Sequence, residues 1–198
     1  MIAAVILSAG ESSRMGSPKA LLPVDGKSFI EGIIATLRRC RVGKILVVLG
    51  HHAAEIGPEI RDLPVTVVIN RDYRRGQLSS LIAAIKSLTV ETAGESVEGL
   101  LLHLVDHPFL SPAVVNAMIE GFYQTGKLIV VPTYRGKRGH PVLFSRDLFE
   151  ELLEAPLDQG AKSVVHAHRD DTLEIPTEEE GVVVDIDTPE DYRSRLRS

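Results

Sequence analysis

The chain has 198 residues and a net charge of −5, with 44% hydrophobic residues, 25% charged residues and a single cysteine, Cys40. These values are typical of one globular domain over residues 1–198, and the acidic balance argues against a general nucleic-acid-binding protein. Since no apolar tract is long enough to span a membrane and one cysteine excludes an internal disulfide, we expect a cytoplasmic protein that contacts neither membranes nor nucleic acids.

Short apolar runs alternate along the chain with segments whose apolar residues recur at helical spacing. The predicted strands are Ala3–Leu7, Ile45–Leu49, Val65–Ile69, Leu100–Val105, Ile129–Val131, Val142–Phe144 and Val182–Ile186. The predicted helices are Phe29–Arg39, Leu78–Leu88, Ala113–Tyr123, Asp147–Leu153 and Lys162–His168. This alternation predicts an α/β three-layer sandwich, in which helices cover both faces of a mostly parallel sheet.

Local signals add detail to this pattern. Ser111 before Pro112 and Thr188 before Pro189 predict helix starts, because Ser or Thr caps a helix and Pro fits its first turn. The polar stretch 89–98 predicts an exposed, mobile loop. The basic turn 134–139 lies between two short predicted strands and indicates a local antiparallel excursion.

The first predicted strand ends in a loop of small residues with two cations. Residues 8–19 include Gly10, Gly16, Arg14 and Lys19. Small residues let backbone N–H groups approach an anion, Arg14 can add a bidentate contact, and Lys19 a point charge. We therefore predict a polyphosphate site at the carboxyl end of the strand, with a solvated surface turn as the alternative. The spacing fits neither a P-loop nor a dinucleotide fingerprint.

Acidic residues follow two other predicted strands. Asp106 comes directly after Leu100–Val105, where a carboxylate suits Mg²⁺, although it could also cap the turn. Asp185 and Asp187 would project to one face of an extended strand, and we expect one of them to be the second ligand, Asp187 being the nearer to the loop. We therefore predict Mg²⁺ as the cofactor, since this ion prefers one or two carboxylate ligands together with phosphate oxygens and water. The histidines lack the spacing of a transition-metal site.

The loop sequence also resembles a known signature. Residues 7–19 follow L-x-[AG]-G-x-S-x-R-M-G-x-x-K, the amino-terminal signature of nucleotidyltransferases of the molybdenum-cofactor type, and meet every fixed position. The resemblance continues through LLHLVDHPFLSP (101–112), GHPVLF (139–144) and DIDTPED (185–191), so it spans nearly the whole chain. It implies a mixed sheet in a nucleotide-diphospho-sugar-transferase-like (Rossmann-like) fold.

The resemblance implies transfer of a nucleotidyl group, in which an acceptor phosphate attacks the α-phosphorus of a nucleoside triphosphate and pyrophosphate leaves. We expect positioning and charge neutralisation to carry the rate, with Lys19, Arg14 and Asp106 as the catalytic residues. The expected nucleotide-binding residues are Leu7, Ala9, Gly10, Ser12, Ser13, Arg14, Gly16, Lys19, Asn70, Gly76 and Ser80.

The sequences LSAG (7–10) and SPK (17–19) in the loop resemble those of the cytidylyl-transferring branch of this family. This resemblance implies CTP as the donor and molybdenum-loaded pterin phosphate as the acceptor. His140 lies in a stretch that resembles a motif bordering the acceptor pocket of that branch. His107 and Arg138 are the other expected acceptor contacts. The family commonly has Gly before and Gln or Met after the aspartate, where this chain has Val105 and His107, so other acceptors stay open.

The alternatives are a nucleotidyltransferase that uses GTP or a sugar or polyol phosphate, and a non-catalytic chaperone that carries the pterin. Retention of Lys19, Asp106 and Asp187 together favours catalysis. The expected partners are the nucleoside triphosphate, the phosphorylated acceptor, and a molybdoenzyme or its chaperone.

Overall fold

The structure is a computed structural model that describes residues 1–91 and 96–195. Its sheet has the strand order β10-β7-β9-β6-β1-β4-β5, with β8 paired to β7. The strands are β1 (Ile2–Ser8), β4 (Lys44–Leu49), β5 (Thr66–Ile69), β6 (Gly99–Leu104), β7 (Ile129–Tyr134), β8 (Lys137–Arg138), β9 (Val142–Ser145) and β10 (Thr172–Pro176). A separate hairpin is formed by β2 (Pro23–Val24) and β3 (Lys27–Ser28).

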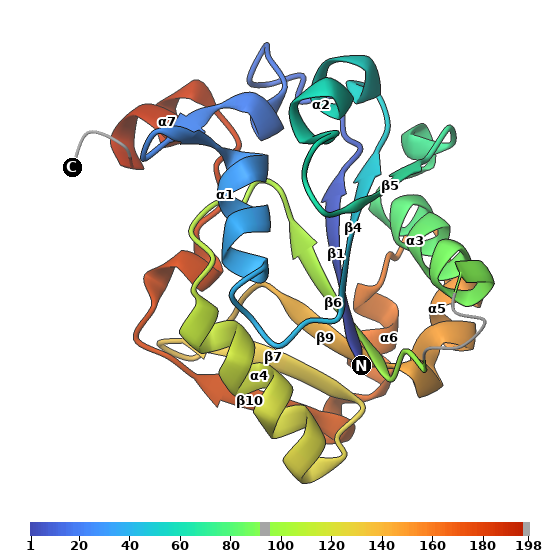
Figure 1. Cartoon of the computed structure of the whole chain (residues 1–198). Helices are drawn as coiled ribbons and strands as arrows, with labels where there is room; N and C mark the ends of the chain where they lie inside the picture. The colour runs from blue at the N-terminus through green and yellow to red at the C-terminus, as the bar shows by residue number, and fades with distance from the viewer. Residues whose placement is uncertain (92–95, 196–198) are drawn as a thin grey trace.

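Helices cover both faces of this sheet (Figure 1). One face packs against α1 (Phe29–Leu37), α2 (Ala53–Ile60) and α4 (Pro112–Thr125). The other packs against α3 (Gln77–Glu91), α5 (Phe149–Glu154) and α6 (Lys162–Ala167). The short 3-10 helices are η1 (Lys19–Leu21), η2 (Tyr73–Arg75), η3 (Arg146–Leu148), η4 (Arg169–Asp171) and η5 (Glu180–Val183), and α7 (Pro189–Arg195) follows last.

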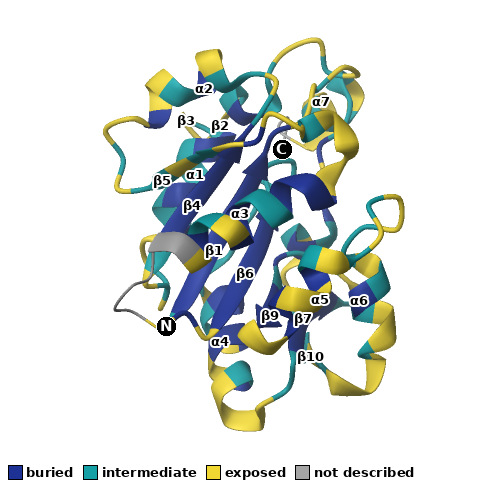
Figure 2. Ribbon diagram, turned by 90° about the vertical axis from the view of Figure 1, so that its right-hand side faces the viewer, coloured by how far each residue is buried: buried dark blue, intermediate teal, exposed yellow. Residues whose placement is uncertain are grey.

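Strand β1 lies at the centre and contributes to both cores. Ile2, Ala4 and Ile6 are buried on the α1 side, whereas the alternating residues Ala3 and Val5 are buried on the α3 side. Figure 2 shows β1 and its neighbours β4 and β6 mostly in the dark blue of buried residues. A strand buried on both faces reads as a continuous apolar run, which is why the sequence predicts it so directly.

The topology places a crevice beside β1. Strand β1 is parallel to β4 on one side and to β6 on the other, and β5 extends the sheet beyond β4. The chain therefore builds the sheet first to one side of β1 and then crosses to the other. Ligands of open α/β sheets bind at such a switch point, at the carboxyl ends of the strands. Only β8 and β9 run antiparallel to their neighbours in this sheet within the described residues, which confirms the predicted mixed, mostly parallel sheet.

Six of the predicted strands are confirmed, but the seventh, Val182–Ile186, is wrong. Its first residues form the 3-10 helix η5, and the rest is irregular. Val182, Val184 and Ile186 are buried and Asp185 is exposed, because the apolar residues pack under the β7–β8 hairpin and against Phe29. This burial produces the alternation that is typical of a strand, although residues 182–186 pair with no strand that the structure describes.

Helix α2 and strand β10 are among the elements that were not predicted. Helix α2 contains Gly57 and Pro58, which weaken any helical signal from sequence. Strand β10 pairs only with β7 at the edge of the sheet, and its Pro176 is tolerated there because an edge strand leaves one side unpaired. The five predicted helices are present, although Asp147–Leu153 begins as η3 before it becomes α5.

The predicted helix starts are present, with different caps. Helix α4 begins at Pro112, but the Ser111 side chain makes no capping bond to the helix and instead lies 3.5 Å from Glu179 Oε1. Helix α7 is capped by a reciprocal pair, because the Thr188 N–H donates to Asp191 Oδ2 and the Asp191 N–H donates to Thr188 Oγ1.

The predicted loop 89–98 is helical at its start, since α3 continues to Glu91, and residues 92–95 lie outside the described residues. The Cys40 thiol donates to the Thr36 carbonyl oxygen, and burial raises its pKa to about 11, so it is a structural thiol. In the part of the chain that the structure describes, no helix has both the length and the apolar character needed to cross a membrane.

Candidate active site

The loop after β1 is folded tightly around Ser12. Ser12 has a φ of 50°, and its carbonyl oxygen accepts hydrogen bonds from the N–H groups of Met15 (2.9 Å) and Gly16 (3.2 Å). The Ser12 hydroxyl oxygen also accepts from the backbone N–H of Lys19 at 3.3 Å. The loop thus returns on itself and brings Lys19 back to the end of β1, with Gly16 (φ 75°) supplying a left-handed turn.

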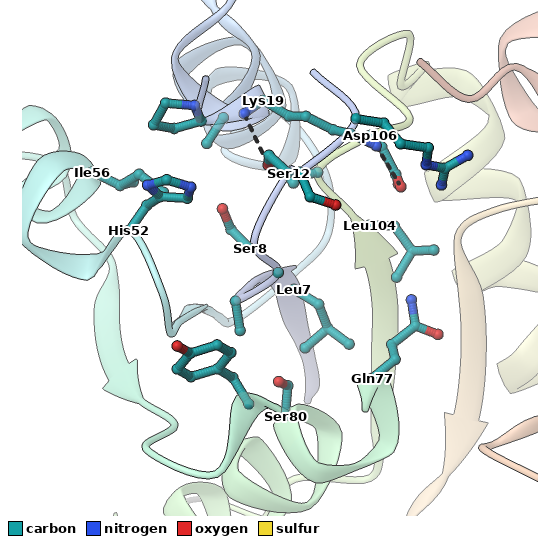
Figure 3. A pocket seen from close by; sticks show the side chains of 18 of the residues that line it. Leu7, Ser8, Ser12, Lys19, His52, Ile56, Gln77, Ser80, Leu104 and Asp106 are labelled. Carbon is teal, nitrogen blue, oxygen red and sulfur yellow. Dashed lines mark hydrogen bonds and ion pairs between the residues drawn. The ribbon is translucent and has the colours of Figure 1, made fainter. Parts of the chain in front are cut away.

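A cavity of about 320 Å³ opens beside this loop (Figure 3). Most of the predicted nucleotide-binding residues line it, together with Asp106. The predicted residues in the lining are Leu7, Ala9, Gly10, Ser12, Ser13, Arg14, Lys19, Gly76, Ser80 and Asp106. The cavity therefore lies at the carboxyl ends of β1 and β6, at the topological switch point.

Asn70 does not line this cavity. Its side chain is buried, and its amide nitrogen donates to Ser79 Oγ and Ser80 Oγ, both at 2.9 Å. Its amide oxygen accepts from the N–H of Asp72 at 2.9 Å. Since both amide hydrogens are engaged within the protein, Asn70 orients the cavity residue Ser80 and leaves no donor for a nucleobase.

Four charged side chains converge at the mouth of the cavity. Lys19 Nζ contacts Asp187 Oδ1 in a short ion pair and lies 3.8 Å from Asp106 Oδ2. Arg14 Nη2 lies 2.6 Å from Asp187 Oδ2. The two acidic segments are held together by the backbone, because the Ile186 N–H donates to the Asp106 carbonyl oxygen at 2.8 Å. The structure brings Asp187 to this cluster, whereas Asp185 is exposed to solvent.

The two carboxyls differ in their electrostatics. Burial raises the pKa of Asp106, and the nearby Asp187 adds to this rise, whereas His107 and Lys19 oppose it. The hydrogen bond from Lys19 holds the pKa of Asp187 below its usual range, with Arg14 contributing. Asp106 Oδ1 is buried and has no hydrogen-bond partner among the described residues.

A buried oxygen without a partner is unfavourable, which indicates that Asp106 Oδ1 is kept for a ligand. A divalent cation fits this donor set, since Mg²⁺ is bound by one or two carboxylates together with phosphate oxygens and water. In the described part of the chain no three His, Cys, Asp or Glu side chains gather into a metal-binding group of their own. Asp106 and Asp187 are therefore the residues that could hold Mg²⁺ together with a bound nucleotide.

The predicted acceptor residues lie outside the lining of the cavity. His107 and His140 have ring centroids 4.8 Å apart, and the ring of the buried His103 lies 6.4 Å from that of His107. Arg138 lies on the β7–β8 hairpin and pairs with Glu174, the Nε to Oε1 distance being 2.8 Å. The predicted antiparallel excursion is confirmed, because β7 and β9, on either side of the basic turn, pair antiparallel.

The buried histidines make stability depend on pH. Burial lowers the pKa of His103 to about 3, and burial followed by the charge of His107 lowers that of His140 to about 4. An unfolded histidine has a pKa of about 6.5, so the unfolded chain binds more protons below that pH. The stability that these neutral rings contribute is complete above about pH 6.5 and is lost as the pH falls toward 3 to 4.

We expect the free energy of unfolding to fall by up to about 1.4 kcal/mol per pH unit for each of these histidines between about pH 6 and pH 5. Urea unfolding at several pH values measures this slope. His103→Leu removes one of these contributions and flattens the slope, and His166→Leu, at an exposed position, is the control. An unchanged slope in His103→Leu would contradict this account.

Sequence reasoning missed several residues in the cavity wall, among them His52, Tyr73 and Gln77. His52 follows β4 by three residues, and parallel neighbours of β1 end at the same edge of the sheet. The run LVVLGHH therefore carried a usable signal, since the end of a second parallel strand beside a phosphate loop is a natural place for a ligand contact.

Residues 4–172 match the protein family described as the MobA-like NTP transferase domain. The chain belongs to this family. As a MobA-like NTP transferase it is a nucleotidyltransferase, which confirms the expected enzyme class. It is similar to the molybdenum cofactor cytidylyltransferase of Escherichia coli K12, with 26% identity over 195 residues that cover 95% of this chain and 92% of that protein.

The chain is also similar to other proteins and to solved structures. The nicotine blue oxidoreductase of Paenarthrobacter nicotinovorans is 28% identical over 155 residues, 74% of this chain and 72% of that protein. The crystal structure of Rv0371c from Mycobacterium tuberculosis H37Rv is 30% identical, with a TM-score of 0.86 and coverage of 100% and 97% of the two chains. Its complex with manganese aligns at a TM-score of 0.80 and 27% identity over 100% and 98%. The structural matches confirm the predicted nucleotide-diphospho-sugar-transferase-like fold.

Proposed function

We propose that this protein transfers CMP from CTP to the phosphate of molybdenum-loaded molybdopterin, with Mg²⁺ as the cofactor. An acceptor phosphate oxygen forms a bond to the α-phosphorus, and the bond from that phosphorus to pyrophosphate breaks. The observation that carries the proposal is the convergence of Arg14, Lys19, Asp106 and Asp187 at the mouth of a cavity beside β1. The name of the E. coli relative supports the choice of CTP and of the acceptor.

Arg14 and Lys19 differ in how firmly their ion pairs with Asp187 hold them in place. Arg14 is 66% exposed, and its ion pair with Asp187 is of the solvent-exposed kind that contributes little stability. Arg14 can therefore exchange Asp187 for the terminal phosphates of the nucleotide at little cost. Lys19 is only 11% exposed and is held by its short contact with Asp187, so its ammonium group stays at the mouth of the cavity, where charge develops on the transferred phosphoryl group.

Asp106 and Asp187 are the expected ligands of Mg²⁺. When bound, the ion would neutralise charge on the phosphate oxygens and polarise the phosphoryl group. The manganese complex of Rv0371c supports a divalent metal in this family. Base recognition is assigned to the backbone at the end of β1, residues 7–10, and to Gly76 and Ser80, which line the same cavity.

The acceptor is assigned to the side of Asp106 that faces His107 and His140, with Arg138 on the neighbouring hairpin. His107 follows Asp106 directly in the chain, and the ring of His140 lies 4.8 Å from that of His107. Both lie outside the nucleotide cavity, as two adjacent substrates require. The product would pass to a molybdoenzyme or its chaperone in the cytosol.

The test is pyrophosphate release with Mg²⁺, molybdenum-loaded molybdopterin and either CTP or GTP. We expect release with CTP that depends on the acceptor. Faster release with GTP would overturn the base assignment, and release only with a sugar or polyol phosphate would overturn the acceptor. Binding of CTP without turnover on any of these acceptors would instead favour a non-catalytic pterin carrier.

A further inference from the structure

His52 lies between the nucleotide cavity and helix α2, and the proposed reaction gives it no role. It is the residue before α2, and its ring lines the cavity next to Ile56 (Figure 3). The side chain is only 15% exposed. In Figure 3 it lies on the α2 side of the cavity, whereas Asp106 lies on the β6 side.

Both ring nitrogens of His52 have acceptors as partners. Nδ1 lies 2.7 Å from Glu55 Oε1, and Nε2 lies 3.0 Å from the carbonyl oxygen of Glu11. A carboxylate and a backbone carbonyl can only accept hydrogen bonds, so both nitrogens must donate. A neutral imidazole carries one N–H, which means that this geometry is satisfied by the imidazolium cation.

The second partner, Glu11, is part of the phosphate loop, and the loop is close to the turn that precedes α2. The His51 N–H donates to the Ala9 carbonyl oxygen at 3.2 Å. A Cβ at Gly50 would lie 2.5 Å from the same oxygen, so only glycine permits this approach. The hydrogen bond from His52 to Glu11 is therefore one of the contacts that hold the loop in the conformation that shapes the cavity.

We propose that His52 is a positioning residue for the triphosphate: its protonated ring fixes the loop at Glu11 and adds positive charge to the cavity wall. The inference rests on the proposed function, because it assumes that a nucleoside triphosphate occupies this cavity. Loss of the proton removes one of the two ring donors and the charge. The loop is then held less well and the phosphates bind less tightly.

The charges around the ring favour the proton. Glu55 faces it from α2 and Glu11 from the loop. The ring of His51 packs edge to face against that of His52, with centroids 4.6 Å apart, and hydrogen-bonds Tyr73 of η2, while Arg74 Nε lies 3.3 Å from Glu11 Oε1. Burial by itself lowers the pKa of His52, but the hydrogen bonds to Glu55 and Glu11 and their charges together raise it above 6.5. Arg14 and Lys19 lie in the same cavity wall, but each is paired with Asp187. Nucleotide affinity is thus highest below this raised pKa and falls as the pH increases through it.

The experiment measures CTP binding by calorimetry, without acceptor, for the wild type and His52→Gln between about pH 6 and pH 9. Gln can donate to one of the two acceptors but carries no charge. We expect the wild type to lose about tenfold in affinity across this range, and His52→Gln to bind about tenfold more weakly at low pH with a flat profile. Cytidine, which lacks phosphates, should bind both proteins alike.

His168→Gln is the matched control, since His168 also contacts a glutamate, Glu151 at 2.6 Å, but lies away from the cavity on the α5–α6 side. It should keep the wild-type pH profile.

A nitrogen–proton spectrum of the imidazoles in the nucleotide-free protein provides a second readout, with two ring N–H signals expected for His52 near neutral pH. His52→Gln binding CTP with the wild-type profile overturns the inference alone, whereas no binding of CTP or GTP by the wild type overturns the proposed function with it.

Discussion

Asp106→Asn is expected to reduce pyrophosphate release by about a thousandfold while the protein stays folded. Asparagine keeps the shape of the side chain but removes the negative charge that a divalent cation needs. Asp106 is partly buried with one oxygen unpartnered among the described residues, so the charge weakens the fold and is useful only when a ligand neutralises it. The variant should therefore be as stable as the wild type or more stable, which separates a lost activity from a lost fold.

Steady-state pyrophosphate release and thermal unfolding measure the two effects. Asp62→Asn makes the same chemical change at a fully exposed position and should leave both unchanged. Asp187 and Asp185, the other two predicted metal ligands, can be compared in the same assay. We expect a large loss of pyrophosphate release for Asp187→Asn and a small effect for Asp185→Asn. Retained activity in Asp106→Asn would overturn the assignment of the metal site.

Gly139→Ala is expected to destabilise the fold by about 3 kcal/mol and to lower the melting temperature by about 10 °C. A Cβ at Gly139 would lie 2.2 Å from the carbonyl oxygen of Val182, which itself accepts the His140 N–H at 2.8 Å. The β7–β8 hairpin approaches η5 at backbone distance here, so the extra carbon can be fitted only by moving one of the two segments.

Gly32→Ala is the matched control for this change. Gly32 lies inside α1, and a Cβ added there would point into open space, so alanine adds helix propensity without a clash. We expect a small gain in stability of about 0.5–1 kcal/mol there. Equal melting temperatures for Gly139→Ala and the wild type would show that the hairpin and η5 are not closely packed in solution.

Much of the fold follows from local patterns. The continuous apolar runs of β1, β4 and β6 predict buried parallel strands, because only a strand covered on both faces loses all of its polar positions. The capping residues before α4 and α7 mark helix starts for an equally local reason, although the Ser111 side chain makes no capping bond to α4.

The errors lie where tertiary contacts replace local preference. The run 182–186 alternates because its apolar side chains fill the space under the hairpin and beside Phe29, and no neighbouring strand is involved. Strand β10 gave no clear signal, since an edge strand that is half exposed needs no regular apolar pattern. A single sequence does not distinguish an alternating run that forms no strand from an irregular run that does.

The chemistry available to this protein follows from its residue types and their order: a small-residue loop with Arg14 and Lys19, and carboxylates after two apolar runs. This holds because these residue types limit what a segment can bind. The packing of the folded chain is what brings Asp187 and not Asp185 to Lys19. It also lets Asn70 donate a hydrogen bond to Ser80 and His52 donate one to Glu11. Each of these contacts joins segments that are apart in the chain, and their distance is set by how the strands and loops pack, which local sequence does not encode.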